Sequence, residues 1–146
     1  MRSIKPVRIS KIGFDFCRYG VAGIVWLAVI FNQPVWLLVS ATILGLSAVL
    51  KIRKAPMVVI GEALLGNFLK EVTVIDENGI RFAHTMGFVL NILVIGIVWS
   101  VPTIGLWVML AFAAMKTVSA AGHCSALKLY DCLNNDTCCK GVKKYV

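Results

Sequence analysis

Residues 82–121 read FAHTMGFVLNILVIGIVWSVPTIGLWVMLAFAAMKTVSAA, two apolar runs joined by the uncharged turn Ser100-Val101-Pro102-Thr103. The runs, 82–99 and 104–121, are each about 18 residues long, near the lower end of the length that spans a bilayer as an α-helix. Lipid offers no hydrogen-bond partner to an exposed backbone, and neither run alternates as a barrel strand does. The stretch therefore predicts a hairpin of two membrane-spanning helices.

The first third of the chain has the same organisation. Residues 14–31 and 35–50 are apolar, and only Asn32-Gln33-Pro34 separates them. A cleaved signal peptide would need a small-residue cleavage site after the first run, but a second apolar run resumes instead, so we expect the first helix to be retained. Both hairpins would start on the same side of the membrane, so a weak tandem repeat would have its axis along the membrane normal.

Composition supports a membrane protein. The chain has 146 residues, 59% of them hydrophobic, and a mean hydropathy of +0.84, which is too apolar for a soluble fold of this size. We predict one all-α domain, residues 1–146, that forms an integral membrane four-helix bundle. Its two tandem hairpins would be residues 14–50 and 82–121.

Three polar regions flank the hairpins: a basic arm at 1–13, a connection at 51–81 and a tail at 122–146. Within the connection, residues 57–70 carry their polar side chains at helical spacing opposite an apolar face, which predicts an amphipathic helix on the membrane surface. The groove of a soluble partner could bind the same face, although the adjacent membrane favours lipid. Residues 76–79, Asp-Glu-Asn-Gly, are typical of a turn.

Charge fixes the predicted orientation. Of the 15 Lys and Arg residues, every one except Lys116 lies in these flanking regions or at the start of the first helix. They are Arg2, Lys5, Arg8, Lys11, Arg18, Lys51, Arg53, Lys54, Lys70, Arg81, Lys128, Lys140, Lys143 and Lys144. The positive-inside rule then places both termini in the cytoplasm and the protein in the cell membrane as a multi-pass protein.

The net charge of +8 also bears on partners. The cations flank membrane helices and lack the interleaved aromatic residues of a nucleic-acid platform, so we expect anionic lipid head groups and no nucleic acid. Other membrane subunits are further candidate partners.

A few polar residues fall within the predicted helices. Lys116 is five residues from Ala121, so its ammonium could snorkel to the cytoplasmic interface or bind a buried polar group. His84 and Asn91 are seven residues apart and share a helix face. We expect an interhelical hydrogen bond from Asn91, because no chain of ionisable groups marks an ion path.

The five cysteines are Cys17, Cys124, Cys132, Cys138 and Cys139, all on the predicted cytoplasmic side. A reducing compartment disfavours permanent disulfides. Cys124, Cys132, Cys138, Cys139 and His123 are candidate metal ligands, although their spacing fits zinc and iron–sulfur sites poorly. Reversible thiol chemistry beside the lysines of the tail, palmitoylation and inert thiols stay open. The sequence requires no cofactor.

No phosphate loop, HExxH motif or nucleophile elbow is present, so an ordinary enzyme is not expected. The leading hypothesis is a structural or accessory subunit of a larger membrane assembly, including one concerned with redox chemistry. The second is thiol-redox or soft-metal handling by the cysteine-rich tail. The third, small-molecule transport, predicts a polar cavity near Asn91.

Several short motifs point to a family. They are Arg81-Phe82-Ala83-His84, Gly87, Gly122-His123-Cys124 and Tyr130. With these motifs the chain resembles the small four-span bacterial and archaeal membrane proteins grouped as a domain of unknown function, whose last helix ends in Gly-Phe-Cys-x-Gly-Cys. Gly122 and Cys124 match that ending, whereas His123, Ala126 and Leu127 replace its Phe, second Gly and second Cys. The resemblance implies a fold and a location but no activity.

Overall fold

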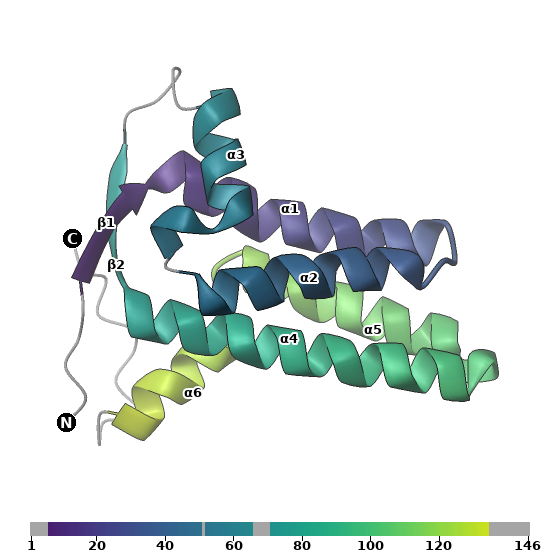
Figure 1. Cartoon of the computed structure of the whole chain (residues 1–146). Coiled ribbons are helices and arrows are strands. Elements are labelled where there is room, and N and C mark those ends of the chain that lie inside the picture. The colour runs from purple at the N-terminus through teal and green to yellow at the C-terminus, as the bar shows by residue number, and fades with distance from the viewer. Residues whose placement is uncertain (1–5, 51, 66–70, 135–146) are drawn as a thin grey trace.

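The computed structural model describes residues 6–50, 52–65 and 71–134 (Figure 1). The chain is mostly helical. The four long helices are α1 (Lys11–Ile30), α2 (Val35–Val49), α4 (Glu77–Ser100) and α5 (Pro102–Ala120). The shorter elements are β1 (Pro6–Ser10), the 3₁₀ helix η1 (Ile52–Lys54), α3 (Pro56–Leu65), β2 (Val72–Asp76) and α6 (Ser125–Asn134).

The four long helices run side by side, and α1 packs on α5 while α2 packs on α4 (Figure 1). The turns between α1 and α2 and between α4 and α5 lie at one end of this group, and all the short elements lie at the other. Three of the long helices, α1, α4 and α5, are long and apolar enough to cross a membrane. The fourth, α2, is apolar but has only 15 residues.

The two turns between long helices are made by residues with suitable backbone preferences. Asn32 adopts a left-handed φ of 48°, which asparagine tolerates better than most residues, and Pro34 follows it as the N-cap of α2. Pro102 occupies the first turn of α5, where a missing N–H costs nothing. Pro34 therefore lies just before α2, whereas Pro102 is the first residue of α5, two residues before the predicted start at Ile104.

The interior between the long helices is apolar and rich in small residues. Its buried members are Val25, Ala28, Leu37, Ala41, Val94, Ile95, Val98, Met109, Phe112 and Ala113. The alanines let the helix backbones approach closely, which is the usual packing mode of helices in lipid.

The prediction that the chain contains only helices is wrong at one point, because β1 and β2 form a two-stranded antiparallel sheet. The register runs from Pro6 opposite Asp76 to Ser10 opposite Val72. Ile9 of β1 is buried in a second apolar cluster with Ile52, Ala55 and Val58. The two strands lie about 60 residues apart in sequence, so no local sequence pattern predicts their pairing.

The predicted turn at residues 76–79 is also wrong, because Asp76 is the N-cap of α4. Its carboxylate accepts hydrogen bonds from the backbone N–H groups of Asn78 and Gly79 at 3.2 and 3.3 Å. Glu77 in the first turn suits the positive end of the helix dipole. The helix thus begins at Glu77, five residues before the predicted start at Phe82.

The predicted amphipathic helix at 57–70 corresponds to α3, while residues 66–70 lie outside the described part of the chain. Val58 and Gly61 of α3 are buried, and α3 packs on α1. The approach is close, because a Cβ built at Gly61 would lie 2.8 Å from the Phe16 Cβ. Protein, rather than lipid alone, therefore covers part of the apolar face of α3.

Candidate functional site

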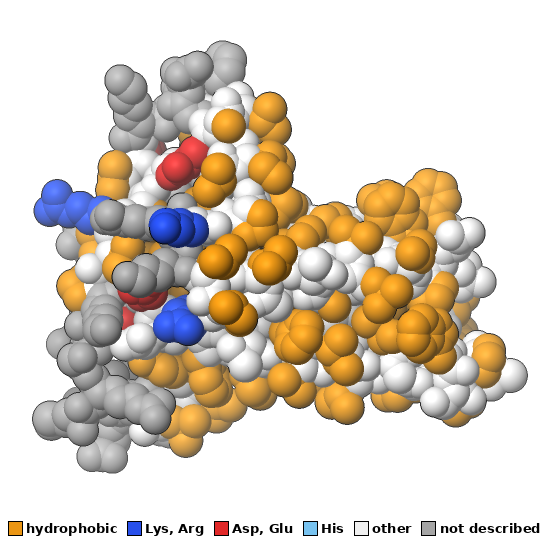
Figure 2. Space-filling model, viewed as in Figure 1, with side chains coloured by type: hydrophobic (Ala, Val, Ile, Leu, Met, Phe, Trp, Pro, Cys, Tyr) orange, Lys and Arg blue, Asp and Glu red, His pale blue; other side chains and the backbone are white. Residues whose placement is uncertain are grey.

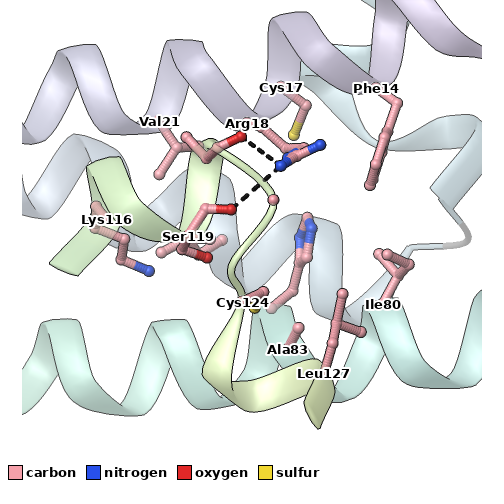
Figure 3. A pocket seen from close by; sticks show the side chains of 14 residues that line it. Phe14, Cys17, Arg18, Val21, Ile80, Ala83, Lys116, Ser119, Cys124 and Leu127 are labelled. Atoms are coloured by element: carbon pink, nitrogen blue, oxygen red, sulfur yellow. Dashed lines mark hydrogen bonds between the residues drawn. The ribbon is translucent and has the colours of Figure 1, made fainter. Parts of the chain in front are cut away.

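A cavity of about 170 Å³ (Figure 3) lies at the end of the long helices where Lys and Arg gather (Figure 2). Helices α1, α4 and α5 supply most of its wall, and the segment between α5 and α6 closes one side. Its apolar lining includes Phe14, Val21, Leu44, Ile80, Ala83 and Leu127. Its chemically active lining consists of Cys17, Arg18, His84, Lys116 and Cys124.

A sharp helix end brings Cys124 to this cavity. The Gly122 N–H donates to the Ser119 carbonyl and the His123 N–H to the Val118 carbonyl, which is the Schellman pattern of helix termination. Gly122 has a φ of 101°, a left-handed conformation that glycine adopts without strain. The chain leaves α5 at this residue and returns across the cavity before α6 begins at Ser125.

Arg18 fixes this helix end to α1. Its guanidinium donates to the carbonyls of Ser119, at 3.3 Å, and of Ala120 (Figure 3). It also pairs with Asp15 at 3.5 Å. The carbonyls at a helix C-terminus lack partners within the helix and carry partial negative charge, so a guanidinium is a favourable cap. Arg18 thereby positions the segment that carries Cys124.

Lys116 projects between the helices from α5. Its ammonium lies over the Phe112 ring, 5.1 Å from the ring centre, and within electrostatic range of His84 and the Cys124 thiol. The absence of a side chain at Gly87 makes the space, because a Cβ there would lie 2.7 Å from Lys116 Nζ. None of the residues that line the cavity is acidic, and all of them belong to the described chain.

Cys17 and Cys124 are free thiols that line the cavity from different elements. Cys17 lies on α1 and is only 3% exposed, whereas Cys124 lies between α5 and α6 and is partly exposed. His84 of α4 contributes a buried Nδ1 without a hydrogen-bond partner in the described structure. The cavity therefore gathers two thiols, an imidazole and two cations.

Comparison with known protein families shows to which family this chain is related. The family model described as "Domain of unknown function (DUF4395)" matches residues 16–134. The chain belongs to this family. The match confirms the resemblance predicted from the motifs, and it includes every residue that lines the cavity except Phe14. No curated protein and no solved structure matches the chain.

Three of the predicted metal ligands of this DUF4395 protein, His123, Cys124 and Cys132, lie in the described part of the chain. Among these three only Cys124 lines the cavity, while His123 is exposed. Cys138 and Cys139 lie outside the described residues, so the metal site stays a prediction for the tail. Between residues 6 and 134, leaving out 51 and 66–70, no three His, Cys, Asp or Glu side chains are grouped to hold a metal ion.

Cys132, on α6 of the DUF4395 chain, is disulfide-bonded. This differs from the expectation that a reducing compartment disfavours disulfides at every cysteine. Sequence spacing alone does not reveal which thiols meet in the fold, and the charge pattern reports only the side of the membrane.

Asn91 of the DUF4395 protein lies away from the cavity. Its Nδ2 donates to Ser40 Oγ across the interface between α4 and α2, and both residues are fully buried. The polar cavity that transport would require near Asn91 is thus not the cavity described, which Asn91 does not line.

Sequence reasoning singled out three of the five active lining residues, Cys124, His84 and Lys116, but in separate roles. It treated Arg18 as an orienting charge and gave Cys17 no special role. One signal could have grouped these five residues. In the predicted topology all of them lie within about two turns of the charged ends of their helices, and therefore at a similar depth below the cytoplasmic membrane surface.

Proposed function

We propose that this protein is a multi-pass membrane protein that carries out thiol–disulfide exchange at its cytoplasmic face. In this proposal α1, α2, α4 and α5 cross the bilayer as two hairpins, and the charged end faces the cytoplasm. The observation that carries the activity is that free Cys17 and free Cys124, 107 positions apart in sequence, line the same cavity as Lys116 and His84.

The surface supports the membrane placement. Leu93 on α4 is 57% exposed and Trp107 on α5 is 71% exposed, and hydrophobic side chains cover the visible sides of the long helices (Figure 2). Lys and Arg gather at the opposite end from the uncharged turns. Exposed apolar surface on this scale requires lipid or protein cover. Exposed Phe31 and Trp99 at the uncharged end suit a membrane interface, where aromatic side chains are enriched.

The proposed reaction begins at Cys124, because it is more accessible than Cys17. The Cys124 thiolate attacks one sulfur of a substrate disulfide R–S–S–R′, forms a mixed disulfide with RS and releases R′S⁻. His84 supplies the imidazole at the cavity that can take the Cys124 proton and return it to the leaving thiolate, and the Lys116 ammonium can stabilise the Cys124 thiolate. A first thiol, R′SH, departs.

Cys17 completes the exchange. Its thiolate attacks Cys124 Sγ, releases RS⁻ and leaves a Cys17–Cys124 disulfide, while the Cys17 proton passes to RS⁻. The substrate disulfide gains two electrons, and the two protein thiols lose them. A cytoplasmic dithiol would return the protein to its reduced form by the reverse exchange.

The other sequence-based hypotheses stay predictions. An accessory role in a larger assembly would also cover apolar surface, but lipid accounts for the same surface without a partner. Soft-metal handling would use His123, Cys124, Cys132, Cys138 and Cys139, and the last two lie outside the described residues. The cavity favours thiol exchange because two free cysteines line it together with basic side chains.

Peptide mapping of the purified full chain tests the proposal. The protein is treated with a neutral small disulfide, 2-hydroxyethyl disulfide, without prior reduction, so that Cys132 keeps its disulfide. The wild-type chain should form a Cys17–Cys124 linkage. Cys17→Ser should instead trap the mixed disulfide on Cys124, and Cys124→Ser should form neither product at these positions.

A matched control moves the thiol by one residue. Ser125 is exposed, so Cys124→Ser combined with Ser125→Cys should accept the reagent without linking to Cys17. Stable modification of Cys124 in the wild-type chain, with no linkage to Cys17, would overturn the exchange mechanism.

A further inference from the structure

The cavity carries more positive charge than its surroundings neutralise. Arg18 is paired with Asp15 and with two carbonyls, but Lys116 Nζ faces only the Phe112 ring among the described contacts. The lining residues include no carboxylate. An ammonium in a partly buried site is costly unless an opposite charge or an acceptor accompanies it. The cavity therefore suits an anionic ligand, which would neutralise the Lys116 charge.

His84 also favours an anionic ligand at this cavity. His84 Nδ1 is buried and has no hydrogen-bond partner in the described structure, although buried polar atoms almost always have one. His84 and Lys116 lie within electrostatic range of each other and line the same cavity. One small ligand with anionic oxygen or sulfur atoms could accept hydrogen bonds from both residues.

Size limits the ligand further. The volume of about 170 Å³ is well below the roughly 300 to 1,000 Å³ of pockets that hold drug-sized molecules. The apolar residues around the charged groups would contact the rest of a short carbon or sulfur chain. A peptide disulfide or a large cofactor would not be enclosed.

We propose that the cavity binds a small anionic sulfur compound, whose anionic group lies at Lys116 and His84 and whose sulfur meets Cys124. The sulfur part of this inference rests on the proposed function, and the anion part rests on the charges of the cavity. The two parts can fail separately.

Two alkylating reagents of nearly equal size test the anion part. Iodoacetate is anionic and iodoacetamide is neutral, and each transfers its carbon to the Cys124 thiolate with loss of iodide. The ratio of their rate constants at Cys124, measured by peptide mapping, is divided by the same ratio for N-acetylcysteine amide. Because both reagents need the thiolate, this normalised preference does not depend on how much thiol is ionised.

The wild-type chain in detergent should prefer iodoacetate by about tenfold, the factor that corresponds to about 1.4 kcal/mol. Lys116→Gln should remove most of the preference, and any change in the ionisation of Cys124 cancels in the normalised ratio. Gly87→Ala is a second variant that keeps the charge but displaces the ammonium, and it should reduce the preference partly. Lys128→Gln is the control, because Lys128 is exposed and does not line the cavity, so its loss should leave the preference unchanged.

Two results would overturn the inference. A normalised preference of one in the wild-type chain would show that the cavity does not attract anions. The exchange reaction would still be tested separately, by the Cys17–Cys124 linkage that 2-hydroxyethyl disulfide should produce. A preference that persists in nanodiscs of neutral lipid but disappears in nanodiscs of anionic lipid would assign the site to a lipid head group instead of a free sulfur compound.

Discussion

Asn91 Nδ2 on α4 lies 2.6 Å from Ser40 Oγ on α2, and neither residue is exposed. The Ser40 hydroxyl in turn donates a hydrogen bond to the Leu37 carbonyl of the same helix. The pair is a polar link in a mainly apolar interior, and it joins α2 to α4.

Removing this link should weaken the contact between α2 and α4. We expect Asn91→Ala to destabilise the protein by about 1 to 2 kcal/mol, and a double-mutant cycle with Ser40→Ala to give a coupling of about 0.5 to 1.5 kcal/mol. Thermal unfolding in detergent measures both. Thr42→Ala is the control, because Thr42 is exposed and its hydroxyl bonds only to Leu38 of its own helix. A coupling near zero would show that the hydrogen bond adds no stability.

The contact between α3 and α1 should be sensitive to one methyl group. Gly61→Ala places a Cβ 2.8 Å from the Phe16 Cβ and 3.1 Å from the Gly13 backbone, so the helices must separate. We expect a loss of about 1 to 3 kcal/mol. Gly23→Ala is the matched control on α1, where a Cβ meets nothing within 4 Å. That substitution should be neutral or stabilise the helix by up to about 1 kcal/mol. Equal melting temperatures for the two variants would contradict the described packing.

The Arg18 cap should control access to Cys124. Arg18→Met removes the donors that hold the Ser119 and Ala120 carbonyls, so the segment after α5 should open more often. Hydrogen exchange of the Gly122 and His123 amides should accelerate, while exchange in the middle of α4 stays unchanged. Arg18→Lys should show a smaller effect because it retains a positive charge at the helix end. Unchanged exchange at Gly122 in Arg18→Met would remove Arg18 from this positioning role.

The junction between the sheet and α1 should depend on acidic pH. The Lys11 ammonium donates to Glu71 at 2.6 Å and lowers the pKa of the Glu71 carboxyl below its usual 4.5. A carboxyl with a lowered pKa stabilises the fold at pH values above its unfolded pKa, and the contribution disappears as pH falls through the lower folded value. Both side chains are exposed, so the effect should be small and should weaken with salt.

Comparison with Glu71→Gln measures this effect. The wild-type chain should melt slightly higher than the variant at neutral pH and low salt, and the two melting curves should converge at acidic pH. A difference that grows as pH falls would have the wrong sign for this ion pair.

Apolar length and uncharged turns predicted the long helices well. The predicted runs 14–31, 35–50, 82–99 and 104–121 differ from the observed helices mainly at the charged ends, where polar residues hide helix starts. Residues 76–79 show the difficulty, because an aspartate before a glycine suits both a turn and an N-cap, and only tertiary packing decides between them. No local sequence pattern predicts the pairing of β1 with β2, because each strand pairs with a segment that is distant in sequence.

The candidate site was harder to predict than the fold. The sequence identified Cys124, His84 and Lys116 separately, and the charge pattern put them on one side. It could not show that Cys17 and Cys124 line the same cavity, because this depends on the packing of α1 against α5 and on the reversal at Gly122. The sequence pattern placed the candidate metal and thiol site in the tail because the tail cysteines are close in sequence. The cavity, by contrast, is lined by residues that are far apart in sequence.

The pairing of β1 with β2 also sets an order of events during synthesis. Ribosomes add residues from the N-terminus, so β1 exists long before residue 76 completes its partner strand. Helices α1 and α2 are therefore made while β1 is still unpaired. The sheet can close only once β2 has been made, just before synthesis reaches α4.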